Sequence, residues 1–322
     1  MNYEPARWLP GGHAMTLFAH LAPRPLGLTP SRERWVLEDG DFLDVDRYGD
    51  RKAPTLVILH GLEGSSRAPY VVRLVASARA FGLAAVAVNF RGCSGEPNRL
   101  PRLYHSGETG DLASVVGRLV EEERGRPILL AGFSLGGNVV AKWLGERERA
   151  LPSEVRAGAV VSAPFDLERC AHVLDRAEGL VRVYRERFLR SLRRKAIDKK
   201  RRFHFLPFDV REVRACRTFA VFDELVTARL HGFAGARDYW TRASARPWLP
   251  RLFRPLLALA ALDDPMVPPD ALPGDEARTN PLLELEVYPS GGHVGFVAGA
   301  PWRFRFFAQA RMAAFLAEAL RR

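Results

Sequence analysis

Apolar and polar positions follow two patterns along this chain. Short runs that are almost wholly apolar recur between longer stretches in which apolar residues lie three or four positions apart. Apolar runs of this kind are typical of strands buried on both faces of a parallel sheet, and the wider spacing predicts amphipathic helices. The runs are 55–59, 84–90, 128–133, 158–162 and 256–262. The pattern therefore predicts an α/β fold of repeated strand–helix–strand units, with helices on both faces of a mostly parallel sheet.

The two ends of the chain add further elements. Residues 1–33 are rich in proline and glycine and predict an N-terminal arm. Two strands at 35–38 and 42–46 are expected to form an antiparallel hairpin that turns at Asp39-Gly40. Residues 283–288 alternate as a strand does, and residues 302–320 have helical spacing.

The alternation of strands and helices is interrupted in the second half of the chain. After 158–162 about ninety residues pass before the next apolar run, and they are charged, aromatic and helical in spacing. We predict one domain in which 34–164 and 251–322 form the core and 165–250 form a helical insertion. The aromatic residues of the insertion are expected mainly to fill its interface with the core, although some could line a substrate pocket.

The composition fits one globular core and carries excess positive charge. The 322 residues have a net charge of +11, and only five of the 48 basic residues are lysines. Residues 182–202 contain eleven of those basic residues against Glu186 and Asp198. Tyr184, Phe188 and Leu192 lie on one face of this helical segment. A solvated basic face is favoured, peripheral contact with an anionic membrane is left open, and nucleic acid is not expected because no recognition motif is present.

Location and redox state follow from features that the sequence lacks. No apolar stretch reaches the roughly 18 residues that a membrane span requires, and the first residues have no signal-peptide pattern, so a cytoplasmic location is expected. Cys93, Cys170 and Cys216 show neither disulfide nor metal spacing and are expected to be free thiols. Cys93 follows a predicted strand and could touch substrate.

The most informative motif is Gly132-Phe133-Ser134-Leu135-Gly136. It joins an apolar run to a segment of helical spacing, so the serine is expected on a sharp strand-to-helix turn. The glycines make room for such a turn, which would expose the Ser134 hydroxyl as a nucleophile.

A nucleophilic serine needs a base and an acid that orients the base. Asp263 and Asp264 follow one apolar run, and His293 follows the strand predicted at 283–288. Both positions lie past strand ends, where open α/β sheets place their sites. His293 is the expected base. Asp264 is preferred to Asp263 as the acid because Asp264-Pro265-Met266-Val267-Pro268 has the D-x-x-V-P spacing found after the acid strand in many hydrolases.

Backbone N–H groups are needed to bind an oxyanion. Leu135, which follows the serine, and Leu62, in the loop after 55–59, are the expected donors. His60 is expected to hold that loop by hydrogen bonds. Glu63 is left open between approaching substrate and being solvated.

Four other residues receive minor roles. His105 is a weaker candidate for the base, and Arg91 is expected to fix a loop through ion pairs. Ser106 and Glu108 are expected to begin a helix, with the serine as its cap. The histidines lack metal-ligand spacing and no phosphate-binding loop is present, so no metal and no cofactor are expected.

Several longer motifs resemble the bacterial YheT-type hydrolases, a branch of the α/β-hydrolase superfamily. The resemblance covers nearly the whole chain and rests on 60–65, 90–99, 104–109, 134–138, 162–165, 222–229 and 291–296. It implies the α/β-hydrolase fold, with the insertion as a helical cap between the sixth and seventh strands. It also implies a Ser134–Asp264–His293 triad and carboxylic-ester hydrolase activity, and eukaryotic relatives act on medium-chain acyl esters or as phospholipases.

The expected function is therefore hydrolysis of small acyl esters, of short to medium chain, through an acyl-enzyme. Three alternatives remain: transfer of the acyl group to an alcohol with the same triad, a phospholipase-like activity at a lipid surface, and a non-hydrolytic binder that uses the basic segment. The sequence predicts neither the physiological substrate nor the oligomeric state.

Overall fold

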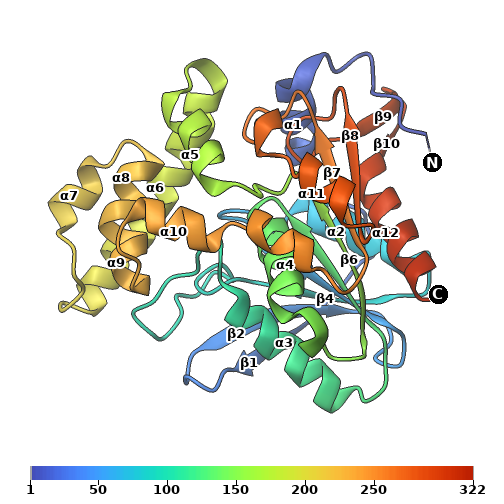
Figure 1. The fold of residues 1–322 in the computed structure, drawn as a ribbon, viewed down its shortest axis with the longest axis horizontal. Coiled ribbons are helices and arrows are strands. Elements are labelled where there is room, and N and C mark those ends of the chain that lie inside the picture. The colour runs from blue at the N-terminus through green and yellow to red at the C-terminus, as the bar shows by residue number, and fades with distance from the viewer. Residues whose placement is uncertain (1, 322) are drawn as a thin grey trace.

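The fold is a sheet of eight strands between two layers of helices, with a separate group of helices at one side (Figure 1). The computed structural model describes residues 2–321. The strand order is β1-β2-β4-β3-β5-β6-β7-β8, and β3 to β8 run parallel, whereas β1 and β2 are antiparallel to their neighbours. The strands are β1 Ser31–Val36, β2 Phe42–Tyr48, β3 Thr55–Leu59, β4 Ala84–Val88, β5 Ile128–Phe133, β6 Val155–Val161, β7 Leu256–Ala261 and β8 Leu283–Tyr288.

Two apolar layers hold the helices to the sheet. One cluster packs α3 and α4 against one face of the sheet, and the other packs α2 and α12 against the opposite face. The core helices are α1 Gly11–Leu21, α2 Pro69–Arg79, α3 Thr109–Glu122, α4 Leu135–Arg147, α11 Gly274–Thr279 and α12 Phe307–Ala319, with 3₁₀ turns η1 Glu148–Ala150 and η4 Pro269–Ala271.

The helical insertion between β6 and β7 forms the cap, which lies to the left of the sheet in Figure 1. The cap has an apolar cluster of its own that also includes Leu62 and Leu103 from loops of the core. Its helices are α5 Leu167–Arg176, α6 Gly179–Arg202, α7 Val210–Ala215, α8 Phe219–Phe222, the π-helical turn η2 Asp223–Thr227, α9 Ala228–His231, α10 Ala236–Ala243 and the 3₁₀ turn η3 Arg246–Arg251. The predicted fold class, with a helical insertion between the sixth and seventh strands, is confirmed.

The predicted strands occur where the apolar runs are. β3, β5 and β8 have the predicted bounds, and the expected hairpin forms between β1 and β2, with Gly40 at a φ of 79° in its turn. β1 begins at Ser31, a few residues earlier than predicted, because its outward positions are polar and carry no apolar signal.

Two predictions for the ends of the chain were incomplete. The predicted arm, residues 1–33, contains helix α1, which was not predicted from the sequence. The first residues of the predicted C-terminal helix instead form strand β10 Arg303–Phe306, which pairs with β9 Val297–Ala300 before α12 begins at Phe307. Arg303 to Phe306 alternates exposed and partly buried positions, which is a strand period rather than a helical one.

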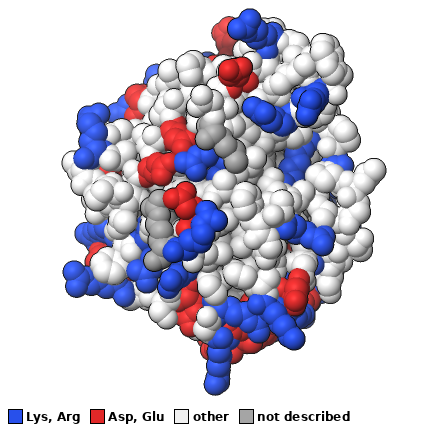
Figure 2. Space-filling model, turned by 90° about the vertical axis from the view of Figure 1, so that its right-hand side faces the viewer, with Lys and Arg blue, Asp and Glu red and all other residues white. Residues whose placement is uncertain are grey.

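The basic segment was predicted as a solvated face, and the structure shows this only in part. Lys199 is buried in α6 and donates to the carbonyls of Asn98 and Leu100, whereas Arg190 and Arg194 are exposed. Figure 2 shows the side of the molecule that lies on the right in Figure 1, away from the cap. On this side, basic and acidic side chains are interspersed and do not form one basic patch. Within residues 2–321, no helix combines the length and the apolarity needed to cross a bilayer.

Candidate active site

Ser134 lies on the sharp turn between β5 and α4. Its backbone has a φ of 51° and a ψ of −121°, a conformation that residues other than glycine rarely adopt. The turn requires glycine on both sides: a Cβ on Gly132 would lie 2.3 Å from the Gly136 oxygen, and one on Gly136 would lie 2.5 Å from the His60 oxygen. The sequence motif therefore folds into a strained turn that presents the hydroxyl at the carboxyl edge of the sheet.

The structure brings Ser134, His293 and Asp264 together, although they are far apart in the sequence. His293 Nε2 lies 2.9 Å from Ser134 Oγ, and His293 Nδ1 lies 2.9 Å from Asp264 Oδ2. The carboxylate beside Nδ1 favours the tautomer with the proton on Nδ1, which leaves Nε2 free to accept the serine proton.

The two adjacent aspartates have different partners. Asp264 Oδ1 accepts hydrogen bonds from the backbone N–H groups of Met266 and Val267, which fix the carboxylate toward His293. Asp263 instead accepts from the N–H groups of Gly291 and Gly292 and so holds the loop that carries the histidine.

Helix α1 supports this histidine loop from the other end of the chain. The N–H of His293 donates to Thr16 Oγ1 at 2.8 Å, and Gly12 packs so closely that a Cβ there would lie 1.8 Å from the Asp263 oxygen. Thr16 and Gly12 could not be recognised from the sequence, because the arm matches no motif. The only signal was the pair Gly11-Gly12 at the start of an otherwise apolar helix.

The two expected oxyanion donors, Leu62 and Leu135, line the same cavity as Ser134. In residues 2–321, neither the Leu62 N–H nor the Leu135 N–H donates to a protein acceptor. The loop of Leu62 approaches closely, since a Cβ on Gly61 would lie 3.2 Å from Ser134 Cβ. His60 holds the loop as expected: its Nδ1 lies 2.7 Å from the Gly61 oxygen, and its Nε2 accepts the Phe90 N–H. Burial lowers the pKa of His60 to about 4, so the ring stays neutral.

Glu63 is largely buried and so is not a solvated loop residue, and it lines the cavity of about 550 Å³ that contains Ser134. It has a φ of 53°, and its carboxylate accepts hydrogen bonds from Tyr104, Ser191 and Lys195. Burial acts to raise the pKa of Glu63, but the Lys195 ammonium and these hydrogen bonds outweigh it and lower the pKa. Because Ser191 and Lys195 belong to α6, the Glu63 carboxylate connects the cap to the loop that carries Leu62, an expected oxyanion donor; we call this loop the oxyanion loop.

Cys93 lies on the other side of the same lysine. Its Sγ is 3.2 Å from Lys195 Nζ, and burial raises the pKa of the thiol to about 11. Cys93 also lines a cavity of about 550 Å³ that contains Ser134. It is therefore placed to touch a bound molecule, while it remains a thiol at neutral pH.

Two cavities meet at Ser134 and His293. One has a volume of about 100 Å³ and is lined mainly by apolar side chains from the cap, including Leu174, Phe188 and Trp240. The other has a volume of about 550 Å³ and is more polar, with Arg24 and Arg187 among the residues that line it. The site thus offers a small apolar compartment and a larger, more polar one, and both include the candidate nucleophile.

The minor predictions had different outcomes. Arg91 does fix loops, through ion pairs with Asp39, Asp41 and Asp111. The prediction that Ser106 caps a helix was wrong: the N-cap of α3 is Glu108, whose side chain accepts the Gly110 N–H, because Ser106 lies two residues too early.

His105 lies away from Ser134 and instead groups with Glu108 and His231, a cluster that sequence spacing did not reveal. Burial lowers the pKa of His105 to about 3. Its Nδ1 accepts the Gly107 N–H, so the ring proton must be on Nε2, the nitrogen that faces Glu108. Arg102 already pairs with the Glu108 carboxylate. This arrangement is that of a neutral hydrogen-bonded group and does not fit a metal site.

Comparison with known proteins identifies the family. A family model for the alpha/beta hydrolase fold matches residues 54–300. The protein named "Putative esterase YheT" of Escherichia coli (strain K12) is 39% identical over 304 residues, which span 92% of this chain and 88% of that protein. "Phospholipase ABHD3" of Mus musculus is 31% identical over 308 residues, spanning 92% of this chain and 74% of that protein.

The solved structure of the Pyrococcus furiosus esterase Pf2001 has a TM-score of 0.59 at 16% identity, over 93% of this chain and 96% of that one, which shows the same fold. The chain therefore belongs to the α/β-hydrolase family and, within it, to the proteins related to YheT.

Proposed function

We propose that this protein is a serine esterase that hydrolyses carboxylic esters through an acyl-enzyme. The observation that carries the proposal is the hydrogen-bonded series from Ser134 through His293 to Asp264, which begins on a strained turn. Leu62 and Leu135, whose N–H groups have no protein acceptor within residues 2–321, line the same cavity. Relatives named as an esterase and a phospholipase support ester bonds as the target.

The mechanism follows from the positions of the groups. Ser134 Oγ attacks the ester carbonyl while His293 Nε2 takes its proton, and Asp264 stabilises the imidazolium that forms. The N–H groups of Leu62 and Leu135 bind the oxyanion, and one such donor typically contributes about 3 kcal/mol to lowering the barrier. His293 then gives the proton to the leaving alcohol, and a water activated by the same nitrogen cleaves the acyl-enzyme.

The two cavities suggest where the parts of the ester bind. The compartment of about 100 Å³ under the cap is apolar and suits an acyl chain of short to medium length. The more polar cavity of about 550 Å³ suits the alcohol and the entering water. Both assignments belong to the proposal.

The test is the rate of hydrolysis of p-nitrophenyl esters from acetate to laurate. We expect a rate maximum at one chain length in the wild type and background rates in Ser134→Ala. Ser153→Ala, which changes an exposed serine far from the site, is the matched control. Labelling by a fluorophosphonate should map to Ser134 and disappear in Ser134→Ala. Turnover that survives Ser134→Ala, or no turnover on any ester, would contradict the proposal.

Transfer of the acyl group to an alcohol is the second candidate, and the large polar cavity next to Ser134 favours it. An alcohol bound there would compete with water for the same acyl-enzyme. Reactions with added ethanol or glycerol, analysed for ester product, distinguish the two fates.

Membrane contact through the segment 182–202 stays a prediction, as does a cytoplasmic location. The exposed arginines of α6, such as Arg190 and Arg194, could meet an anionic surface near the site. Co-sedimentation of Ser134→Ala with anionic and neutral vesicles measures this contact separately from catalysis.

A further inference from the structure

A buried carboxyl group without a cationic partner lies in the wall of the apolar cavity. Asp223 is only 9% exposed and begins the π-helical turn η2. Its Oδ1 accepts from Thr227 Oγ1 at 2.7 Å, and its Oδ2 accepts from Trp240 Nε1 at 2.8 Å. Among residues 2–321, no lysine, arginine or histidine forms an ion pair with it.

Burying the charged form of this carboxyl group lowers the stability of the folded protein. Burial raises the pKa of Asp223 to about 7, since the cavity wall cannot replace the lost hydration of the charge. A carboxylate offers about four acceptor positions, and the protein uses two of them. Holding Thr227 and Trp240 in place needs only a neutral acceptor, so those two contacts do not account for a carboxyl group.

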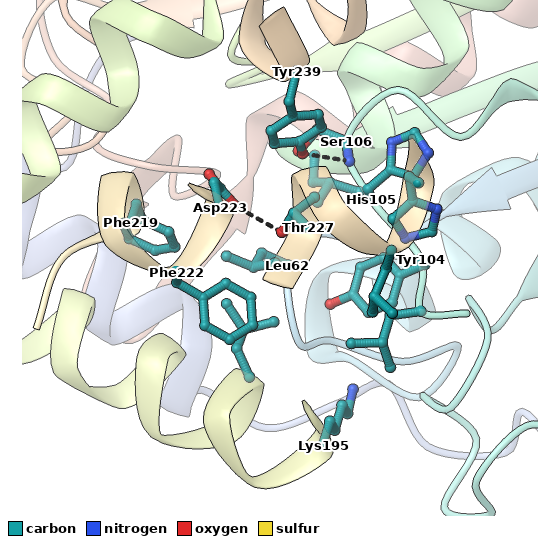
Figure 3. A pocket seen from close by; sticks show the side chains of 15 residues that line it. Leu62, Tyr104, His105, Ser106, Lys195, Phe219, Phe222, Asp223, Thr227 and Tyr239 are labelled. Atoms are coloured by element: carbon teal, nitrogen blue, oxygen red, sulfur yellow. Dashed lines mark hydrogen bonds between the residues drawn. The ribbon is translucent and has the colours of Figure 1, made fainter. Parts of the chain in front are cut away.

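A second polar group lies beside Asp223. Tyr239 Oη accepts the Ser106 N–H at 3.0 Å and still carries a proton that it can donate. Asp223, Tyr239 and Ser106 all line the apolar cavity of about 100 Å³ beside Ser134. All three also line a third pocket, of about 70 Å³, which shares Leu62 and Leu135 with that cavity but does not include Ser134. Figure 3 shows this third pocket, with Tyr239 and Ser106 at the top, Asp223 and Thr227 beneath them, and Phe219 and Phe222 next to and below Asp223. The apolar compartment therefore has one polar wall.

We propose that Asp223 and Tyr239 form a subsite for a hydroxyl group on the acyl chain of the substrate. A hydroxyl group both donates and accepts, so it matches a carboxyl that accepts and a phenol that donates. A plain hydrocarbon chain would leave the remaining acceptor positions of Asp223 and the hydroxyl proton of Tyr239 without partners in an apolar space. A hydroxyl group on the chain would supply those partners. The inference rests on the proposed esterase function and on the acyl chain binding beneath the cap. It names hydroxyacyl esters as the substrate class.

The experiment compares esters that differ only in the hydroxyl group. Pairs of p-nitrophenyl alkanoates of equal length, one unsubstituted and one with a hydroxyl on a successive carbon, are assayed for kcat/KM. At pH 8.5, above the raised pKa of Asp223, the wild type should prefer the hydroxylated ester at one position by roughly tenfold or more, the usual range for a hydrogen bond to a charged group. In Asp223→Asn and in Tyr239→Phe the ratio of the two kcat/KM values should fall several-fold toward one.

Glu224→Gln is the matched control, because it changes the neighbouring carboxyl group to an amide at an exposed position that lines neither cavity. It should keep the wild-type ratio. Thermal unfolding shows whether each variant is folded. A wild type without preference at any hydroxyl position, or a preference that survives in both Asp223→Asn and Tyr239→Phe, would overturn the inference.

A binding assay separates this inference from the proposed function. Methyl esters of hydroxylated and plain fatty acids are titrated into Ser134→Ala, and the fluorescence of Trp240, which lines the cavity, reports binding. Tighter binding of the hydroxylated ester that is lost on adding Asp223→Asn supports the subsite even if the wild type hydrolyses no ester. Hydrolysis with equal binding of both esters supports the esterase and refutes the subsite.

Discussion

Several residues around the site have backbone conformations that side chains seldom adopt. Glu63, Ser134, Ser162 and Val294 have φ values of 53°, 51°, 50° and 64°. Ser134 carries the candidate nucleophile, Glu63 adjoins an expected oxyanion donor, and Val294 follows His293. Ser162 Oγ accepts the Val294 N–H, which links two of these positions. Each such conformation costs on the order of 1–3 kcal/mol, so the surrounding packing must hold the loops of the site in place.

The two adjacent aspartates give a prediction with an internal control. Asp264→Asn should lower kcat by about 10⁴, because an amide beside Nδ1 favours the wrong histidine tautomer. Asp263→Asn should lower kcat far less, since the amide oxygen can still accept from Gly291 and Gly292. Steady-state rates on one p-nitrophenyl ester measure both. Equal losses in the two variants would contradict the assignment of Asp264 as the acid.

At the scale of elements, the sequence predicted buried segments better than exposed ones. β3 and β5 were predicted to the residue because parallel strands buried on both faces are continuous apolar runs. The candidate nucleophile, base and acid followed from motifs at the ends of such strands. In contrast, α1 and β10 were missed, since a short helix and a two-stranded ribbon at the surface have weak periodicity.

Contacts between elements could not be predicted either. Nothing in the sequence near Glu63 indicates that its partner is Lys195, 132 positions away on α6. Likewise, Asp223 gave no signal as a cavity residue, because a carboxyl in a helical segment ordinarily faces solvent. Tertiary packing alone places these groups.

The pair of Glu63 and Lys195 predicts an energetic link between the oxyanion loop and the cap. Glu63→Gln or Lys195→Met alone should lower the free energy of unfolding by about 3–5 kcal/mol, because each leaves a largely buried charge without its ion-pair partner. The double variant should lose less than the sum of the two. Urea unfolding measures stability, and kcat should fall together with it, since the loop carries Leu62.

Arg190→Met is the control for that experiment. It removes an exposed cation from the same helix and should leave both stability and kcat near wild-type values. If Glu63→Gln and Lys195→Met have strictly additive effects, the two residues do not act as a pair.

For the whole molecule, the buried carboxyl of Asp223 predicts how stability depends on pH. Its folded pKa is raised to about 7 from 3.8, with burial as the main cause and the Asp175 charge as a smaller one. Between these values the folded chain keeps a proton that the unfolded chain has released. The contribution of Asp223 to the free energy of unfolding should therefore fall as pH rises from about 4 to about 7.

Asp223→Asn removes this dependence. The melting temperature of the variant minus that of the wild type should increase between pH 5.5 and pH 8.5, because only the wild type has to bury a charge at the higher pH. Calorimetry at both pH values checks this. A difference that stays constant or decreases would show that the carboxyl is not held protonated by burial.

The contact between helix α1 and the histidine loop has a consequence for how the protein is made. Thr16 lies 277 positions before His293, whose N–H it accepts, and is therefore synthesised long before it. During synthesis α1 has no histidine loop to dock against until those positions have been made. A nascent chain that already carries the complete Ser134 turn still lacks this loop, so the proposed site can be completed only after α1 and the loop have met.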